Sequence, residues 1–530
     1  MSVVTLSTDR WAVGDCVIIY EKRLLTKVQQ VLGASVKSLR MPPPINPDRD
    51  DAEDPEAYKG IPVKPFPRWM RCVNCGLLSS VDSGLFTLKE DNYRPERTQY
   101  VHRGCKGSDG KKKAKDADAV PARFLLACAD GHLDDFPWRW FVHHGPTDCR
   151  GTLRFKERGG SLQTEDLYVS CDECQKSRPM AQAFGEMGRR SLPACRGRHP
   201  HLDDFEPDCD QQPRAILLGA SNGWFPVTLS ALAIPVTANS LAQYISDGWD
   251  EFENLQNEEQ LKGAIVFLKG TGKFPGIEKH TTSKIWEAIE AHRNGAVIEQ
   301  NDLKSPEWEV FTEKNPPKNF PHFMSDPVGA PVGFENKIDR VLLLTRLREV
   351  NALIGFTRID APAEESTEAT EHRASLSRST PDFVPASETH GEGILVQFNE
   401  KALSDWADLA SVKERDAMLF SAHKGWRSKR KLNPEDLGYP GIRYVLLHTF
   451  SHILIREFAL QCGYNAASIR ERIYADVGGE QDQAGVLIYT AAADSDGTLG
   501  GLVELGKPEN LRLILEKALD RAKICASDPL

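Results

Sequence analysis

The amino-acid sequence predicts a multidomain α+β protein with a zinc-binding N-terminal module, a largely helical middle region and a mixed α/β C-terminal domain. Three observations support this prediction. A chain of 530 residues is too long for one hydrophobic core and suggests two or three domains. Ten of the twelve cysteines precede residue 210, which places the candidate metal ligands in the first part of the chain. Near the C-terminus, an apolar helical pattern is followed closely by a buried-strand pattern.

The first two expected regions differ in composition. Residues 1–65 combine an amphipathic segment, Val17–Leu39, with a stretch rich in proline and acidic residues, and we expect an extended N-terminal strap. Residues 66–215 hold the CxxC pairs and are expected to form a Cys-rich zinc-binding module. Because the cytosol keeps thiols reduced, these cysteines are expected to bind metal rather than to form disulfides.

Helical periodicity marks the middle of the chain. Large apolar residues recur at helical spacing between Asp247 and His292, and a strong helix is predicted at Lys337–Leu353. We therefore expect residues 216–358 to be mainly helical. Residues 359–392 are poor in large apolar residues and are expected to form a disordered linker or an exposed loop.

The C-terminal region, residues 393–530, carries the clearest patterns. Tyr444–Leu460 is apolar on nearly every side, which predicts an enclosed helix, and Gly463 is a suitable stop. Asn465 is a suitable N-cap for a second helix that runs through Tyr474. The other predicted elements are strands at Gly393–Phe398 and Gly485–Thr490 and a helix at Asn510–Lys523.

Several strings of this sequence resemble a helicase-associated C-terminal family of formerly unknown function, whose members are fused to superfamily-2 helicases or stand alone. The strings are HTFSH, SIRERIY and GVLIYTAAADSDGTLGGL near the C-terminus, and FPRWMRCVNCG, VPARFLLACADGHLDDFPW and REVNALIGFTR upstream. Among the stand-alone members, the chain is most similar to the DrmB proteins of the bacterial DISARM anti-phage system. The resemblance implies a cytoplasmic, non-catalytic accessory subunit that pairs with a DrmA-like helicase and assists DNA binding and translocation.

The strongest chemical signal is a set of four cysteines in the zinc-binding module. Cys171 and Cys174 form a CxxC pair, Cys195 follows after 20 residues, and Cys209 follows after 13 more. A CxxC turn supplies two neighbouring thiolates, and two later cysteines can close a tetrahedral site. The spacing predicts one structural zinc ion on these four residues. Cys149 is a fifth candidate without a paired neighbour.

A second zinc site is predicted earlier in the module, at Cys72, Cys75, His102 and Cys105. The resemblance suggests a CxxC pair at the second half of this site, so His102 departs from the family pattern. Cys128 or His132 could supply the fourth ligand instead. Both predicted sites are closed and structural, since neither pattern has three ligands and a water position.

Two further motifs could belong to a metal-dependent hydrolase or nuclease, which is the rival function. His448 and His452 lie four residues apart on the predicted helix, but Thr449 replaces the glutamate that follows the first histidine in zinc proteases. Packed core histidines are the simpler interpretation. Asp494 and Asp496 lie in a DxDGTL string typical of phosphatases, although three alanines separate it from the preceding strand. A glycine-rich turn is the simpler interpretation there.

Nucleic-acid contact is predicted for one basic segment, with a solvated loop as the alternative. Its candidate residues are Lys424, Trp426, Arg427, Lys429, Arg430 and Lys431. A net charge of −10 argues against a chain that coats nucleic acid by itself, although a stand-alone single-stranded DNA-binding protein is a third candidate function. The sequence contains no GxxxxGK[ST] string or DEAD-type motif, so we expect no ATP hydrolysis by this chain.

The two ends of the sequence lead to two last expectations. No apolar run reaches the roughly 18 residues of a spanning helix, and the N-terminus lacks the pattern of a signal peptide, so a cytoplasmic protein is expected. Similar proteins continue past a Cys-x-x-Asp-Pro-Leu string into a cysteine-rich tail. We therefore expect a natural chain longer than Leu530, with Cys525 at the border of that tail.

Overall fold

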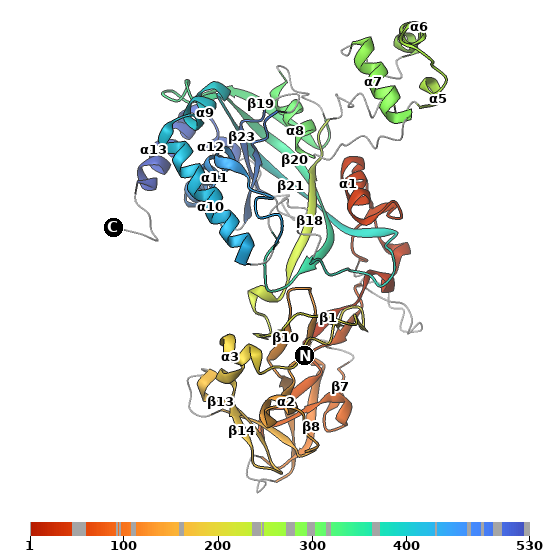
Figure 1. Cartoon of the computed structure of the whole chain (residues 1–530), viewed down its shortest axis with the longest axis vertical. Coiled ribbons are helices and arrows are strands. Elements are labelled where there is room, and N and C mark those ends of the chain that lie inside the picture. The colour runs from red at the N-terminus through yellow and green to blue at the C-terminus, as the bar shows by residue number, and fades with distance from the viewer. Residues whose placement is uncertain are drawn as a thin grey trace. The chain divides into compact units, whose positions relative to one another are not determined.

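The computed structural model divides the chain into two compact units (Figure 1). The first unit comprises Met1–Tyr20, Val28–Leu229 and Ala352–Ala386, and the second comprises Glu21–Lys27, Ser230–Asn351 and Ser387–Leu530. The structure describes residues 2–44, 60–91, 94, 97–107, 113–157, 164–235, 245, 249–271, 281–293, 303–313, 320–362, 372–429, 432–463, 468–478, 482–490 and 501–523.

The largest sheet in the described part of the first unit is antiparallel and has eight strands. Its strand order is β14-β13-β12-β6-β5-β9-β8-β7. Two CxxC pairs lie in tight turns between neighbouring strands of this sheet. The strands are β5 (Trp69–Cys72), β6 (Leu77–Ser80), β7 (Thr87–Lys89), β8 (Gln99–Cys105), β9 (Lys115–Pro121), β12 (Leu153–Glu157), β13 (Leu167–Cys171) and β14 (Ser177–Pro179).

The first unit also contains a three-stranded sheet in the order β11-β10-β17. Aromatic side chains of this sheet and of the short helix α2 (Trp138–His143) build one core with the larger sheet, in which Phe124, Phe141 and Phe155 are buried. The strands of the three-stranded sheet are β10 (Phe124–Ala127), β11 (Leu133–Asp135) and β17 (Arg214–Leu217). The other strands and α-helices described up to residue 217 are β1 (Val3–Thr5), β2 (Ile18–Ile19), α1 (Lys22–Leu32), β3 (Ser38–Arg40), β4 (Val63–Pro65), α3 (Gly185–Arg190), β15 (Arg198–His199) and β16 (Asp204–Phe205). Helix α1 is divided between the two units, because Glu21–Lys27 belong to the second.

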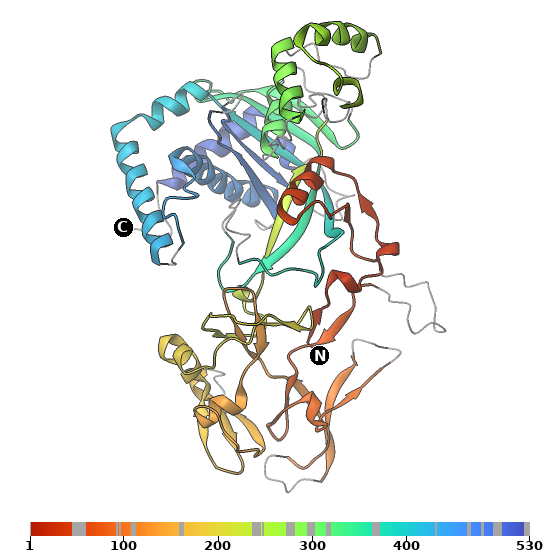
Figure 2. The same ribbon diagram turned by 45° about the vertical axis from the view of Figure 1, so that its right-hand side comes forward.

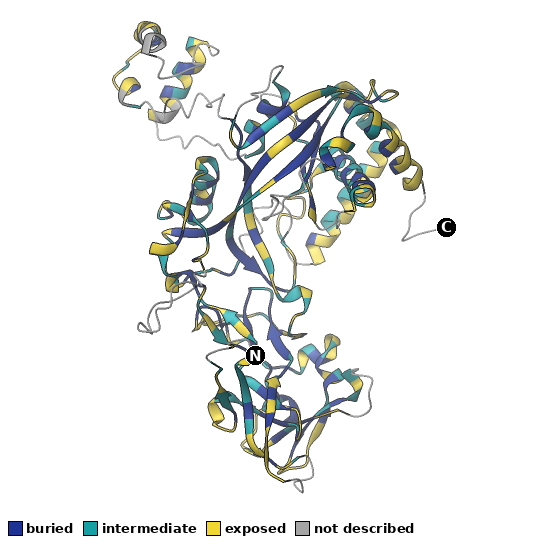
Figure 3. Cartoon of the chain, turned by 180° about the vertical axis from the view of Figure 1, so that it is seen from behind, coloured by how far each residue is buried: buried dark blue, intermediate teal, exposed yellow. Residues whose placement is uncertain are grey.

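The second unit is organised around a sheet with the strand order β18-β20-β21-β23-β22, in which β19 also pairs with β20. Both faces of this sheet are covered by helices, and its strands are largely buried (Figure 3). The strands are β18 (Phe225–Leu232), β19 (Phe323–Gly329), β20 (Ile338–Thr357), β21 (Phe383–Phe398), β22 (Ile469–Tyr474) and β23 (Gly485–Thr490). Strands β18, β20 and β21 are divided between the two units. Their residues 225–229, 352–357 and 383–386 belong to the first unit.

Alternate residues of these strands enter two different cores. On one face, Val341 and Ile488 pack with Leu454 of the helix α11 (Gly441–Cys462). On the other face, Leu342 and Leu487 pack with side chains of α8 (Lys304–Thr312). Figures 1 and 2 show the sheet from two directions, and in both the blue helices near the C-terminus lie along the face that carries Val341 and Ile488. They are α11, α12 (Gly501–Leu505) and α13 (Pro508–Ala522).

Burial on both faces explains two wrong secondary-structure predictions. The segment predicted as a helix at Lys337–Leu353 is strand β20, whose continuous apolar run is buried from both sides. The second predicted helix is strand β22, in which Arg472 looks exposed by composition but is buried in an ion pair with Glu307. The predicted N-cap, Asn465, lies outside the described residues.

Other predicted elements are confirmed, with shifted ends. The predicted helices at Tyr444–Leu460 and Asn510–Lys523 correspond to α11 and α13, and Gly463 ends α11 with a φ of 69°. The predicted strand at Gly393–Phe398 starts ten residues earlier, so residues 383–392 are strand rather than exposed loop. Helices fill much of the expected helical stretch before residue 293, at α5 (Trp249–Phe252), α6 (Glu258–Thr271) and α7 (Thr282–Arg293).

The α+β, multidomain class is therefore confirmed. Two helices of the second unit, α9 (Glu400–Ala407) and α10 (Ala410–Lys429), precede α11. None of the described helices is long and apolar enough to cross a membrane.

Candidate metal centres

Three groups of potential zinc ligands in the described part of the first unit each contain three cysteines and one histidine. Within each cluster the four ligand atoms lie within 4.8 Å of one another. We name them the first cluster (Cys72, Cys75, His102 and Cys105), the second cluster (Cys128, His132, Cys195 and Cys209) and the third cluster (His143, Cys149, Cys171 and Cys174).

The distances between ligand atoms suit zinc. A tetrahedral ion with zinc–sulfur bonds of about 2.3 Å holds two sulfur atoms about 3.8 Å apart. The sulfur–sulfur distances are 3.7 Å between Cys72 and Cys105, 3.7 Å between Cys128 and Cys195, and 3.6 Å between Cys149 and Cys171. A disulfide would bring two sulfurs to about 2.05 Å, and every described cysteine is free. Three thiolates and one imidazole form a common closed zinc set.

The first cluster is built on the turn between β5 and β6. Cys72 ends β5, Cys75 follows in the turn, and the amide of Gly76 donates to the Cys72 carbonyl at 3.0 Å. Gly76 has a φ of 68°, and a Cβ atom there would lie 2.5 Å from the Phe155 carbonyl oxygen. Only glycine fits this turn without strain. Strand β8 supplies the other two ligands, with His102 Nδ1 3.4 Å from the Cys75 sulfur.

The third cluster repeats this turn between β13 and β14, at one edge of the same sheet. Cys171 ends β13, and the amide of Gln175 donates to the Cys171 carbonyl at 3.1 Å, as Gly76 does in the first cluster. His143, at the end of α2, places Nε2 3.3 Å from the Cys174 sulfur. Its Nδ1 lies 2.7 Å from the Arg139 carbonyl oxygen, which orients the ring. Such a partner on the outer nitrogen is typical of metal-bound histidines.

The second cluster uses the turn between β10 and β11. Cys128 follows β10 and His132 precedes β11, so that His132 Nδ1 lies 3.2 Å from the Cys128 sulfur. The opposite ring nitrogen of His132 lies 3.1 Å from a carboxylate oxygen of Glu206. A carboxylate in this place fixes the ring and raises the basicity of the ligand nitrogen. The same carboxylate oxygen lies 3.2 Å from His199 Nε2.

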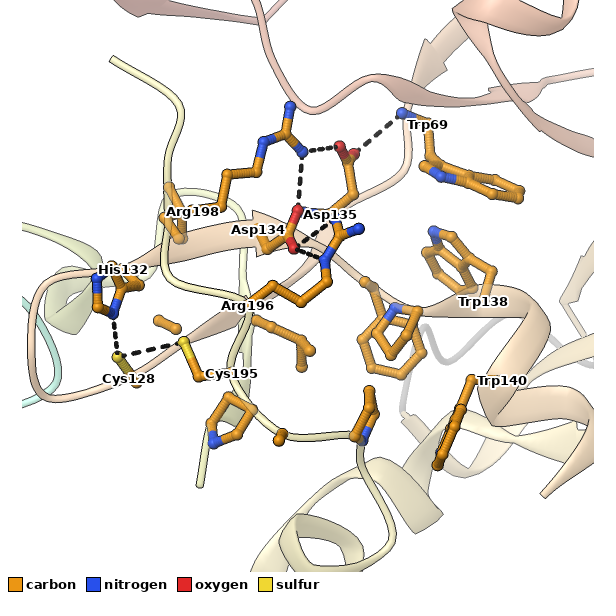
Figure 4. A pocket seen from close by; sticks show the side chains of 18 of the residues that line it. Trp69, Cys128, His132, Asp134, Asp135, Trp138, Trp140, Cys195, Arg196 and Arg198 are labelled. Carbon is orange, nitrogen blue, oxygen red and sulfur yellow. Dashed lines mark hydrogen bonds and ion pairs between the residues drawn. The ribbon is translucent and has the colours of Figure 1, made fainter. Parts of the chain in front are cut away.

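A cavity of about 370 Å³ borders the second cluster. Figure 4 shows Cys128, His132 and Cys195 at one end of it and Trp69, Trp138 and Trp140 at the other. Between them lies an ion-pair network, in which Arg198 contacts both Asp134 and Asp135 at 2.8 Å and Arg196 contacts Asp134 at 2.7 Å. These charged side chains of the cavity wall are therefore already engaged in ion pairs with one another.

One cysteine in each cluster has a lowered pKa. Contact with the Cys128 thiol lowers the pKa of Cys195 well below that of an ordinary thiol. Burial raises the pKa of Cys171, but backbone N–H groups of the turn at Cys174 outweigh burial and lower it to about 7. The same two opposing effects leave the pKa of Cys105 lowered. Thiolate is the form that binds zinc, so each cluster holds one thiol that ionises readily.

The structure changes the predicted ligand grouping. It brings Cys72, Cys75, His102 and Cys105 together, and the alternative ligands Cys128 and His132 belong to the second cluster instead. The single site expected on Cys171, Cys174, Cys195 and Cys209 is wrong, because the first two residues belong to the third cluster and the last two to the second. The physical reason lies in the packing of three elements. Cys128 and His132, next to β10 and β11, lie beside Cys195 and Cys209, and His143 of α2 lies beside Cys171 and Cys174.

Sequence reasoning missed part of the ligand sets. The sequence pattern gives Cys149 no paired neighbour, predicts Cys128 and His132 only as alternative ligands of the first cluster, and does not indicate His143 as a ligand. One available signal was the Cys128-x3-His132 spacing after an apolar strand pattern, which resembles a turn with two ligands. His143 has no such signal, because its partners follow it by six residues or more.

The two helical histidines do not lie in the core. His448 and His452 project from α11 with side-chain exposures of 37% and 63%, so the expectation of packed core histidines is wrong. Their nearest carboxylate is Glu471 of β22, and the three residues form a further group of potential ligands. Asp494 and Asp496 lie outside the described residues.

The candidate nucleic-acid residues lie on a helix rather than a loop. Lys424, Trp426 and Lys429 belong to α10, and Trp426 is 42% exposed. Arg427 is only 1% exposed and donates to the Pro434 carbonyl at 2.8 Å, so it is a structural residue and not a surface contact. Arg430 and Lys431 lie outside the described residues, as does Cys525.

Comparison with known proteins gives two matches to family models and one close relative. Residues 1–225 match a domain of unknown function, DUF8724, and residues 450–528 match the MrfA Zn-binding domain. The chain is 32% identical over 487 residues to the DISARM protein DrmB of Bacillus paralicheniformis. The aligned region covers 89% of this chain and 82% of the relative. The zinc-binding match and the Cys/His clusters together point to zinc binding.

The segment that matches the zinc-binding domain lies far from the three clusters in sequence. In the described part of residues 450–528, the only cysteine is Cys462, which is half-buried at the end of α11 and belongs to none of the ligand groups. The described cysteines of this segment therefore do not form a closed zinc site. The Cys/His donor sets that fit zinc lie in residues 72–209.

Proposed function

Since the chain belongs to the DrmB family of DISARM proteins, we propose that it is a non-catalytic accessory subunit that binds a DrmA-like superfamily-2 helicase. In this proposal the pair assists DNA binding and translocation during anti-phage defence. The observation that carries the proposal is the match to a DISARM protein along 89% of the chain. A match of this extent covers both compact units and not one shared domain.

The chemistry of the first unit supports a structural role. Each of its three clusters already contains four ligands, and a four-ligand zinc site has no open position for substrate or water. We propose one Zn²⁺ ion in each cluster. The three ions would hold the β5–β6, β10–β11 and β13–β14 turns, because a structural metal site contributes its binding energy to folding.

The charge of the chain supports a shared role in DNA binding. A net charge of −10 opposes tight binding of polyanions by the isolated chain. The sequence also lacks a phosphate-binding GxxxxGK[ST] string, so the ATP-driven step is assigned to the helicase. DNA contact by this chain is then local, and α10 is the candidate element.

The proposal is tested by co-expression with the helicase of the same DISARM system. We expect the two chains to co-elute in size-exclusion chromatography and the isolated subunit to show no ATPase activity. Addition of the subunit should change the ATPase rate or the DNA affinity of the helicase. A superfamily-2 helicase from an unrelated system serves as the control and should not co-elute.

Two results would contradict the proposal. ATP turnover by the purified single subunit would show that the chain is an enzyme. Separate elution of the two chains, with helicase activity unchanged by the subunit, would remove the helicase as partner. Zinc content does not decide this point, because it reports on the metal sites of the chain and not on its partner.

A further inference from the structure

We propose that His448, His452 and Glu471 form an open transition-metal site on the surface of the second unit, distinct from the three closed clusters. The site would hold one divalent ion of the zinc type, with a fourth position left for water. The observations behind it are the placement of a carboxylate on an apolar face, the distances among three ligand atoms, and the exposure of two imidazoles.

Glu471 lies where the sheet would otherwise bury an apolar side chain. Along β22, residues 469, 471 and 473 share one face, because side chains alternate along a strand. Ile469 and Ile473 are buried on that face against Leu454 and Phe458 of α11. The carboxylate between the two isoleucines is only 18% exposed and is directed at the same helix. A carboxylate in this place requires polar partners.

The helix presents two imidazoles to that carboxylate. His448 and His452 are four residues apart on α11, so they lie on one face of the helix one turn apart. Their Nε2 atoms are 2.9 Å from each other. Glu471 Oε1 lies 3.1 Å from His448 Nε2 and 3.4 Å from His452 Nε2.

These three distances are close to those of a metal site. A zinc ion bound at about 2.1 Å to nitrogen and oxygen ligands in a tetrahedron holds the ligand atoms about 3.4 Å apart. The ligand atoms of the present group are 2.9–3.4 Å apart, so shifts of a few tenths of an ångström would complete the geometry. Two imidazoles and one carboxylate suit zinc and neighbouring transition metals better than magnesium or calcium.

The open position distinguishes this site from the Cys/His clusters. It has three protein ligands, and the His452 side chain is 63% exposed, so solvent reaches the group. Two histidines and one glutamate with an open fourth position are a known arrangement for a metal that keeps an exchangeable water. His452 and Glu471 also lie in the segment that matches a zinc-binding domain, whose described cysteine belongs to no ligand group.

Cobalt binding to the full-length protein tests this site, because Co²⁺ reports its ligands by colour. The protein is purified with zinc in the cysteine clusters, treated with a mild chelator that removes exchangeable metal, and titrated with Co²⁺. We expect one Co²⁺ per chain, with visible absorption bands but without the near-ultraviolet thiolate charge-transfer band that cysteine ligands produce. Added Zn²⁺ should abolish the visible bands.

Two ligand variants and one control complete the experiment. His452→Ala and Glu471→Gln should each weaken Co²⁺ binding by more than the roughly 10- to 100-fold that loss of an orienting partner costs at metal sites. His423→Ala serves as the control, because His423 is a helical histidine of α10 whose Nε2 lies 2.9 Å from the Leu437 carbonyl oxygen and which belongs to no ligand group. The control should bind as the wild type does.

His452 is exposed, so its loss should leave the melting temperature unchanged and the binding result interpretable. Equal Co²⁺ affinity of wild type, His452→Ala and Glu471→Gln would overturn the proposal. The proposal would also be overturned if the wild type bound no Co²⁺ with a spectrum that lacks the thiolate band. The three residues would then form a hydrogen-bonded group without a metal.

Discussion

At the scale of the residue, the proposed zinc ligands differ from cysteines that only fill space. Cys195 contacts Cys128 at 3.7 Å within the second cluster, whereas Cys16 is buried at 5% exposure and belongs to no ligand group. We expect Cys195→Ser to lower the zinc content by about one ion per chain, since a neutral hydroxyl is a poor replacement for a thiolate. Elemental analysis of the purified protein measures this change.

Cys16→Ser is the matched control and should keep the zinc content of the wild type. Cys75→Ser and Cys174→Ser extend the comparison to the first and third clusters, and each should also remove about one ion. If wild-type protein contained no zinc, or if Cys195→Ser and Cys16→Ser contained the same amount, the assignment of the second cluster would fail.

At the scale of the element, α10 is the candidate DNA contact. Lys424 and Lys429 each carry a charge on this helix, and Trp426 between them exposes an aromatic ring. If both lysines contact phosphates in the helicase complex, Lys424→Gln with Lys429→Gln should reduce the slope of log affinity against log salt by about 1.4–1.8. The slope is measured by DNA binding at several salt concentrations.

The control uses two other lysines, one on α9 and one in the first turns of α10. Lys401→Gln with Lys413→Gln removes two exposed lysines that already form ion pairs with Asp405 and Asp408. This variant has the same net charge as the test variant and should keep the wild-type slope. Equal slopes for the two variants would assign the basic face of α10 to solvent.

At the scale of the whole molecule, the first unit is discontinuous in sequence. It needs residues 352–386, although the matching family model ends at residue 225. Within this unit, Arg358 donates to the Gly131 carbonyl at 2.9 Å, and Ser375 O lies 2.7 Å from His201 Nε2. Gly131 has a φ of 79°, and a Cβ atom there would lie 2.7 Å from Ala374 Cβ.

A fragment that ends at residue 229 should therefore be less stable than one that also carries residues 352–386 through a long Gly/Ser linker. At least a dozen hydrogen bonds join residues 352–386 to residues 1–229. At about 1 kcal/mol each, the loss of only three of them would already cost about 3 kcal/mol. For a domain of this size we expect a melting temperature lower by about 6–12 °C. Thermal denaturation followed by circular dichroism measures the difference.

The linked fragment with residues 352–386 in scrambled order is the control and should melt like the short fragment. Equal melting temperatures for the short and the natural linked fragments would show that residues 1–229 fold independently. In that case the contacts of Arg358 and Ser375 would contribute little to stability.

Local pattern alone determined a large share of this protein. The apolar run of α11, the glycine that ends it and the short apolar run of the buried strand β23 follow from side-chain pattern and turn chemistry, which are properties of neighbouring residues. The first cluster also follows from local spacing, because each of its two pairs of ligands lies three residues apart. Resemblance of whole strings indicated the family, which the comparison confirmed.

Only the tertiary structure decided which distant residues meet. The division of Cys171, Cys174, Cys195 and Cys209 between two clusters depends on where β10, β11 and α2 pack, and spacing carries no record of that packing. The sequence predicts a helix where strand β22 lies, because Asn465 suits an N-cap. The partners of Arg472 and Glu471, which are Glu307 and the α11 histidines, come from other elements. Charges that are paired across a fold are compatible with burial, and the pairing exists only once the fold has formed.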